Sequence, residues 1–292
     1  LYALFSPVEV RAADREVCRS CTTHSCYRGN ERGLACPTFQ YLGTMNENTY
    51  CIACMECVKT CEQDNVALRL RPWAADLFAR RKPRSDEAYL ALIMLSLTGF
   101  HGLTMTGAWN RWIDALREGT GMGETQAFTV AMAAITIGPI ALYGVLVALS
   151  RLAAGLRAGS YRDHFLSYAY ALLPIALFYH LAHNSEHLLM EGQRLLPLLS
   201  DPLGLEWNLF GTASWSLAPL VHAQTLWAVQ VLLVLIGHVY SLVATHRAAS
   251  AIYSDPRALR RSQLPMLAAM VAFSVMSLWL LKQPMQMRMS WM

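Results

Sequence analysis

Eight cysteines, which are all the cysteines of the chain, lie between Cys18 and Cys61 and form two runs of four. The second run has the spacing C-x2-C-x2-C-x3-C, which is typical of a bacterial [4Fe-4S] ferredoxin. The first run is a longer variant, C-x2-C-x4-C-x9-C, and Pro37 follows its last cysteine. A cubane cluster needs four thiolates around one small volume, so these spacings predict two [4Fe-4S] clusters.

The fourth ligand of each cluster in two-cluster ferredoxins comes from the other run of cysteines. We therefore predict that each cluster takes three thiolates from one run and one from the other. The first predicted set is Cys51, Cys54, Cys57 and Cys36, and the second is Cys18, Cys21, Cys26 and Cys61. Structural zinc and disulfides are the alternatives. Zinc takes two separated pairs of cysteines per ion, and disulfides need an oxidising compartment.

Four histidines of the apolar segments repeat one spacing. Histidine is costly inside a bilayer and usually marks a function there. His164 and His180 are sixteen residues apart, as are His222 and His238, which corresponds to about 24 Å along a helix. Antiparallel helices would then pair histidines at two depths, as axial ligands of two b-type haems. We predict His180 with His222 as the outer pair and His164 with His238 as the inner pair. His101 is an alternative outer ligand, and simple packing at helix ends stays open.

A second hypothesis for the apolar segments is a quinol site. Such a site needs a group that accepts protons from the hydroxyls and an apolar pocket for the ring. His183, Glu186 and His187 offer proton-accepting groups near the end of one segment, where a polar group at the water boundary is the alternative.

The C-terminal end of the chain is rich in methionine. Met285, Met287 and Met289 alternate with other residues, and thioethers of this kind can bind Cu(I), a soft ion. A strip that faces lipid or a partner protein is the other explanation.

The composition indicates which elements must position these residues. The chain is 54% hydrophobic and only 15% charged, which is typical of a membrane protein with a small soluble part. We predict a mainly α fold: a two-cluster [4Fe-4S] ferredoxin-like head followed by a bundle of five transmembrane helices. Each apolar segment is close to the ~20 residues that cross a bilayer. The predicted spans are residues 88–108, 126–150, 165–190, 219–244 and 264–281.

The remaining segments complete the predicted domain organisation. Residues 1–17 are expected to be the end of a membrane segment whose earlier part is missing, and residues 18–70 form the head. Residues 71–87 are expected to form an interfacial linker helix, with Trp73, Leu77 and Phe78 on one face. The five spans occupy residues 88–281, and residues 282–292 form an external tail.

The basic residues of the connections predict the orientation. Thirteen Lys and Arg lie on the side of the head and five on the other side. Because cytoplasmic loops are enriched in these residues, we expect an inner-membrane protein with a cytoplasmic head and a periplasmic C-terminus. The formal net charge of +4 arises from these loops, so no nucleic acid is expected as a partner.

The run from Cys51 to Cys61, together with the irregular run that ends in Cys36 and Pro37, resembles the integral-membrane polyferredoxins. That family includes the quinol dehydrogenase subunit of periplasmic nitrate reduction, the nitrous oxide reductase regulator and the cbb3 oxidase accessory protein. The resemblance covers about residues 1–75. It implies electron transfer between a membrane donor and an acceptor, with all eight cysteines as cluster ligands. One departure is Glu62, which stands where the family usually has a proline after the last cysteine.

We therefore expect the electron-transfer subunit of a respiratory oxidoreductase. It would pass electrons between a quinol or haem b site in the membrane and two [4Fe-4S] clusters, with other redox subunits, the quinone pool and lipid as partners. The alternative is a copper reductase or an assembly or regulatory protein for another redox enzyme. A structural anchor whose clusters only hold the head together is a third hypothesis.

Overall fold

The computed structural model describes residues 1–79, 83–156 and 159–283. The chain divides into two compact units, Leu1–Lys82 and Pro83–Met292, which we call unit 1 and unit 2. The predicted copper ligands Met285, Met287 and Met289 lie outside the described residues.

All eight cysteines belong to unit 1, in the part of the sequence between its two antiparallel strands. The strands pair with Val8 opposite Leu70, Val10 opposite Leu68 and Ala12 opposite Val66. A small apolar core of Val10, Ala12, Leu42 and Met45 packs against the cysteines. The elements of unit 1 are the 3-10 turn Tyr2–Phe5, β1 (Val8–Ala12), α1 (Arg15–Ser20), α2 (Ser25–Arg28), α3 (Glu56–Thr60), β2 (Val66–Leu70) and α4 (Ala75–Phe78). Helices this short are held by their surroundings rather than by their own hydrogen bonds.

Arg71 connects the first residues of unit 1 with the segment that follows β2. Its buried guanidinium donates to the Asp76 carboxylate at 2.7 Å, and it also donates to the carbonyls of Ser6 at 2.9 Å and Ala3 at 3.2 Å. Asp76 in turn accepts a hydrogen bond of 2.7 Å from the backbone N–H of Asn48. A charge of this kind is stable away from water only because every partner is present.

These contacts correct two predicted boundaries. Residues 8–12 form the strand β1 of unit 1 rather than the end of a membrane segment, because their backbone groups pair with β2. The segment 71–87 does not form one interfacial helix. Only Ala75–Phe78 is helical before the undescribed residues 80–82, since Asp76 faces Arg71 inside unit 1 instead of the solvent.

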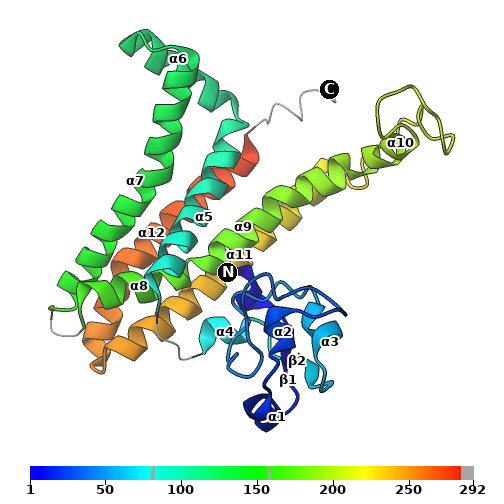
Figure 1. Cartoon of the computed structure of the whole chain (residues 1–292). Coiled ribbons are helices and arrows are strands. Elements are labelled where there is room, and N and C mark those ends of the chain that lie inside the picture. The colour runs from blue at the N-terminus through cyan, green and yellow to red at the C-terminus, as the bar shows by residue number, and fades with distance from the viewer. Residues whose placement is uncertain (80–82, 157–158, 284–292) are drawn as a thin grey trace. The chain divides into compact units, whose positions relative to one another are not determined.

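Unit 2 is helical in all the elements that the structure describes (Figure 1). They are α5 (Ser85–Thr104), α6 (Gly107–Thr120), α7 (Glu124–Ala153), α8 (Tyr161–Ala171), α9 (Leu173–Glu186), the π-helix η2 (His187–Glu191), the 3-10 turn η3 (Gly192–Arg194), α10 (Leu195–Ser200), α11 (Ala223–Ile252) and α12 (Pro256–Lys282).

Four helical segments within the described residues are long and apolar enough to cross a membrane, so the chain is a membrane protein. They are Glu124–Ala153, Tyr161–Ser200, Ala223–Ile252 and Pro256–Lys282. The prediction of five spans is therefore confirmed for four. The predicted span 88–108 corresponds to α5, which is not one of the four and which ends at Thr104. Two acidic residues in the first turn of α5, together with His101, reduce its apolar character.

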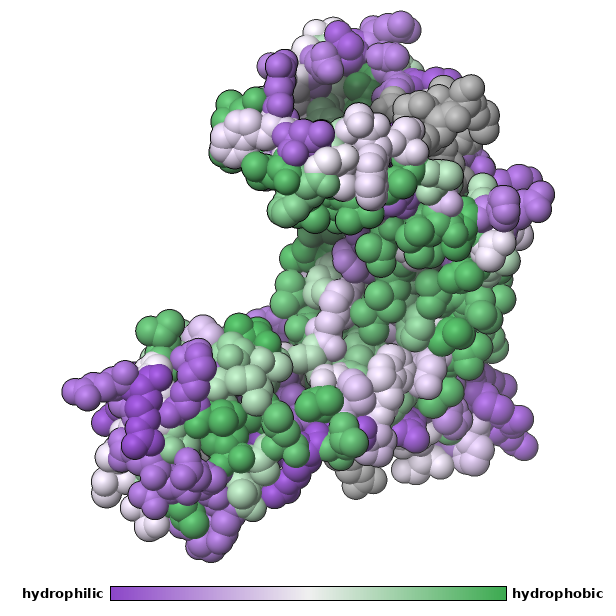
Figure 2. Space-filling model, turned by 90° about the vertical axis from the view of Figure 1, so that its right-hand side faces the viewer, coloured by the Kyte–Doolittle hydropathy of each residue, from purple (hydrophilic) through white to green (hydrophobic). Residues whose placement is uncertain are grey.

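The surface of unit 2 is largely apolar, as expected for helices that face lipid. Figure 2 shows a broad hydrophobic band over its helices, with hydrophilic residues gathered beyond both ends of the band. Large apolar side chains are exposed on three helices: Leu142, Val145 and Leu149 on α7, Leu232, Leu235 and Val239 on α11, and Val271 and Val275 on α12. In water such a surface would be strongly unfavourable, whereas in lipid it needs no cover.

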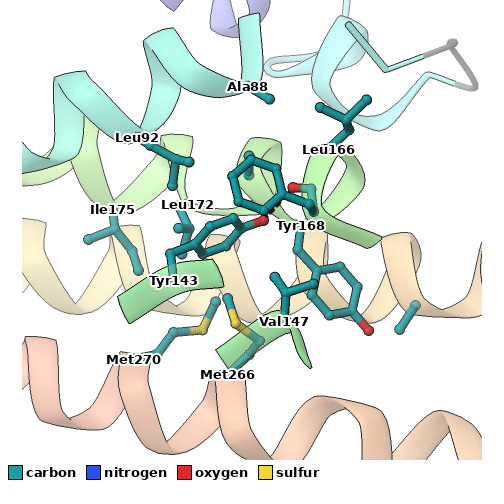
Figure 3. Packing of buried hydrophobic residues seen from close by; sticks show 13 residues of the cluster. Ala88, Leu92, Tyr143, Val147, Leu166, Tyr168, Leu172, Ile175, Met266 and Met270 are labelled. Carbon is teal, nitrogen blue, oxygen red and sulfur yellow. Dashed lines mark hydrogen bonds between the residues drawn. The ribbon is translucent and has the colours of Figure 1, made fainter. Parts of the chain in front are cut away.

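The interior of unit 2 combines aromatic and thioether side chains from several helices. Figure 3 shows Tyr143 of α7, Leu172 at the α8–α9 junction and Met270 of α12 in one cluster of buried side chains. The Tyr143 hydroxyl is buried and donates to the carbonyl of Phe165. Beside this core lies an almost wholly apolar cavity of about 490 Å³, lined by α5, α7, α12 and the start of α9.

The helices α9 and α11 pack closely in an antiparallel register fixed by a glycine. A Cβ at Gly237 would lie 2.7 Å from Cβ of Phe178 and 3.0 Å from the carbonyl oxygen of Pro174. Gln230 donates to the carbonyl of Ala182 at 3.0 Å, and Ser241 donates to the carbonyl of Ala171. This register decides which side chains of the two helices share a level.

Candidate cysteine and histidine sites

The cysteines of unit 1 surround two separate cavities. One cavity is lined by Cys36, Cys51, Cys54 and Cys57. The other cavity is lined by Cys18, Cys21, Cys26 and Cys61. Each cavity thus takes three cysteines from one run and one from the other, which is the grouping predicted from the spacing. All eight are described as free thiols, so none of them forms a disulfide.

The two exchanged cysteines share a local structure that the spacing alone did not indicate. Cys36 accepts a hydrogen bond of 3.3 Å from the backbone N–H of Gln40, and Cys61 accepts one of 3.3 Å from the backbone N–H of Asn65. In both cases the donor is four residues beyond the cysteine. N–H groups that point at sulfur favour the thiolate and its metal-bound form. Because these donors are backbone groups, the only sequence signal is their position four residues beyond each exchanged cysteine, not the Gln or Asn side chain.

Asn65 also connects the two ends of its cysteine set. Its side-chain amide donates to Cys18 Sγ at 3.3 Å and to the carbonyl of Asp14 at 2.6 Å. The sulfurs of Cys18 and Cys61, which are far apart in sequence, are therefore held by one residue. Glu62 acts in the same region, since its carboxylate accepts a hydrogen bond of 2.8 Å from the Ser25 hydroxyl, next to Cys26.

The loop that carries Cys51, Cys54 and Cys57 has an unusual backbone. Ala53 and Met55, on either side of Cys54, have positive φ angles of 53° and 65°. Left-handed conformations are unfavourable for residues with a side chain and are enriched at functional sites. Here they turn the chain tightly enough for three cysteines to reach one cavity.

The thiols respond differently to their surroundings. Burial and the nearby Cys51 raise the pKa of Cys57 to about 11. Burial also opposes ionisation of Cys36, but hydrogen bonds from Thr38 and from the backbone N–H of Gln40 outweigh it and lower its pKa. Four thiols that line one cavity, one of them with a raised pKa, cannot all be thiolates unless a cationic group compensates their charge.

The donor set fits an iron–sulfur cluster in both cavities. Four cysteines line each cavity, backbone N–H groups point at the sulfurs of Cys36 and Cys61, and the small core of the unit packs against several of the cysteines. A bound cluster would also add a stabilising element to a small unit with few buried apolar residues.

A histidine site lies in unit 2, where α5 packs against α9. One ring nitrogen each of His101, His183 and His187 lies within 4.8 Å of the other two. The ring centroids are 4.9 Å apart for His101 and His183 and 5.1 Å apart for His183 and His187. Two predicted quinol-site residues are thus brought together with the predicted alternative haem ligand.

Acidic and amide groups surround this histidine site. His187 Nδ1 lies 3.3 Å from the Glu191 carboxylate, and both residues belong to the π-helix η2. Glu186, the third predicted quinol residue, is buried and accepts a hydrogen bond of 3.3 Å from the Gln230 amide. Neither Glu186 nor any of the three histidines lines the apolar cavity of unit 2, so the room for a ring and the proton acceptors do not coincide.

The structure does not bring together either predicted pair of haem ligands. The register of α9 and α11 offsets His180 from His222, and His164 from His238, by about 15 Å along the helix axes. Both nitrogens of His164 are also engaged, at 2.8 Å from the Ser160 carbonyl and 2.7 Å from the Tyr253 hydroxyl. The predicted pairs required His180 to lie at the same level as His222, and His164 at the same level as His238. The close contact at Gly237 instead sets a register in which they do not.

Comparison with known proteins gave no match: neither a family model, nor a curated protein, nor a solved structure matches the chain. The function is therefore inferred from the geometry of the two sites.

Proposed function

We propose that the chain is a membrane-anchored iron–sulfur protein that transfers single electrons through two [4Fe-4S] clusters in a ferredoxin-like unit 1. The observation that supports this function best is the lining of the two cavities, each by four free thiols that combine both runs of cysteines. A [4Fe-4S] cluster supplies one-electron redox chemistry at a potential tuned by burial and hydrogen bonds to sulfur.

The residues of unit 1 have distinct tasks in this function. The eight cysteines hold the clusters, with Cys36 and Cys61 exchanged between the runs. Gln40 and Asn65 direct N–H groups at sulfur and thereby stabilise the more negative, reduced state. Leu42 lines both cavities, so the two cavities share an apolar residue in their walls.

We further propose that α5 is a fifth span. It lies along α8 and α9 in the same direction, because the backbone N–H of Arg84 donates to the Tyr170 hydroxyl at one end and His101 contacts His183 at the other. Five spans would place unit 1 and the ends of α7 and α11 on one side of the membrane, which the basic residues predict to be the cytoplasm. The proposed partners are other redox subunits and the quinone pool.

The function is tested by single replacements of the exchanged cysteines. Cys36→Ala and Cys61→Ala are purified anaerobically in detergent beside Cys51→Ala and Cys18→Ala, and iron, sulfide and the EPR spectrum of the reduced protein are measured. We expect each variant to lose about half of the iron. The spectrum of Cys36→Ala should match that of Cys51→Ala, and the spectrum of Cys61→Ala should match that of Cys18→Ala.

The control is Ser20→Ala, which removes an exposed hydroxyl of α1 outside both cavities and should keep both signals. A match between Cys36→Ala and Cys18→Ala would mean that the fourth ligand is not exchanged. Zinc without iron or sulfide in the unaltered protein would overturn the proposed function.

A further inference from the structure

The histidine site of unit 2 has distances that suit a metal ion. A tetrahedral zinc ion with Zn–N bonds of about 2.0–2.1 Å holds its nitrogen ligands about 3.3–3.4 Å apart. The Nε2 atoms of His183 and His187 are 3.4 Å apart. The His101 side chain is exposed, so a rotation of its ring can bring the third nitrogen to the same distance.

The carboxylate of Glu191 prepares His187 to bind a metal. It lies 3.3 Å from Nδ1 of His187, so the ring proton stays on Nδ1 and the lone pair of Nε2 points toward His183. Metal-binding histidines nearly always donate their other ring N–H to a carboxylate, a carbonyl or water. The π-helix η2 carries both residues, and such local widening of a helix is frequent at functional sites.

His183 is buried in a way that packing alone does not explain. Only 1% of the residue is exposed, yet its Nδ1 is buried without a hydrogen-bond partner among the described residues. His164 provides the contrast within the same unit, because it is fully buried and both of its nitrogens have partners. The other ring nitrogen of His183, Nε2, lies 3.4 Å from Nε2 of His187. A cation bound between these two Nε2 atoms would offset the cost of burying them, although it would not contact Nδ1 of His183.

We propose that His101, His183 and His187 bind a divalent first-row transition-metal ion of the type that prefers imidazole, such as Zn²⁺. The site lies in the helical unit and is separate from the thiol cavities of unit 1. Three protein ligands leave one coordination position for water or an external ligand, which is the arrangement of reactive rather than purely structural zinc sites. The exposed side of His101 is where that position opens.

The test is element-specific, because the cysteines of unit 1 can also bind zinc. The full-length protein is purified in detergent with its clusters, loaded with one equivalent of Zn²⁺ and examined by X-ray absorption at the zinc edge. We expect nitrogen scattering at about 2.0 Å with the outer-shell pattern of imidazole, whereas cysteine would give sulfur at about 2.3 Å. Metal analysis should find one zinc ion held through size-exclusion chromatography.

Variants then assign the ligands. His183→Ala and His187→Ala should each weaken zinc binding by roughly tenfold or more, with the iron content and cluster EPR signals unchanged. His246→Ala is the matched control, since His246 is an exposed histidine of α11 that contacts only Gln263 among the hydrogen bonds of its ring in the described structure. If His183→Ala does not fold, His187→Gln provides the same comparison with a smaller change of volume.

Zinc that keeps its affinity in both His183→Ala and His187→Ala would overturn the site, as would a spectrum with sulfur scattering alone. These results are independent of the proposed function: a protein without iron–sulfur clusters would still show imidazole scattering, and a protein with clusters could still lack it.

Discussion

The thiol cavities of unit 1 and the histidine site of unit 2 assemble their ligands in opposite ways. In unit 1, three ligands of each cavity come from one short segment, and a tight loop with left-handed residues brings them together. In unit 2, His183 and His187 are one turn apart on continuous helical chain, but His101 arrives from a separate helix. The spacing of residues along the sequence therefore predicts which side chains a short loop brings together. It does not predict which residues of two separate helices meet, because that depends on how the helices pack.

The two units also differ in the interactions that stabilise their folds. Unit 1 has a small apolar core and buried polar contacts such as the ion pair between Arg71 and Asp76. Unit 2 is held by close contacts between helices and exposes apolar side chains around its outside. Variants in one region should therefore leave the other unchanged, and the following four predictions test that independence.

The largest effect is expected from Arg71→Ala in unit 1. The change leaves the buried Asp76 without its ion-pair partner among the described residues, which costs about 3–5 kcal/mol. Hydrogen exchange of peptides covering β1 and β2 should accelerate by roughly 150- to 5000-fold, while peptides from α9 and α11 should not change. Arg19→Ala, which removes an exposed ion pair with Glu16, is the control. Equal exchange in the two variants would contradict the role of Arg71.

Gly237→Ala should act on unit 2 alone. The added Cβ meets Cβ of Phe178 and the backbone of Pro174, so α9 and α11 must separate, at a cost of about 2 kcal/mol. The melting temperature in detergent should fall by about 4–8 °C, with iron content unchanged.

Gly138→Ala is the matched control for Gly237→Ala, because a Cβ at Gly138 of α7 meets nothing within 4 Å. It should be neutral or slightly stabilising, since alanine favours a helix. A Gly237→Ala protein as stable as Gly138→Ala would show that the glycine does not set the register.

Glu191→Gln should weaken zinc binding at the histidine site by about 10- to 100-fold. The amide no longer attracts the Nδ1 proton of His187 as strongly, so the Nε2 lone pair is less available. Isothermal titration with Zn²⁺ measures the change. Glu118→Gln on the exposed part of α6 is the control, and an identical affinity in the two variants would remove Glu191 from the site.

The smallest effect should come from Asn65→Ala. Loss of the side-chain N–H that points at Cys18 Sγ disfavours the reduced state of one cluster, so its midpoint potential should fall by about 40 mV, or about 1 kcal/mol for one electron. An EPR-monitored redox titration follows both clusters in one sample, and the signal that Cys36→Ala abolishes serves as the internal reference. A rise in potential, or an equal shift of both signals, would contradict the assignment.

The sequence predicted the grouping of the cysteines because ferredoxin spacing is a property of short loops. It also located four apolar helices, because length and hydropathy suffice for them. It missed Gln40 and Asn65 because their backbone N–H groups act at sulfur whatever their side chains are. It assigned His101 and His183 to different sites because their contact depends on how α5 lies along α9. The predicted pairs of haem ligands are not brought together for a related reason: the contact at Gly237 sets how α11 is positioned along α9.

The pairing of β1 with β2 has a further consequence for how unit 1 can be carried by a protein. The strand that leads into the cysteine region and the strand that leaves it are direct neighbours, about 4.8 Å apart. The segment that carries the eight cysteines therefore begins and ends at two neighbouring strands. Such a segment can be inserted into a surface turn of another protein, or removed from one, without displacing the residues on either side of the join.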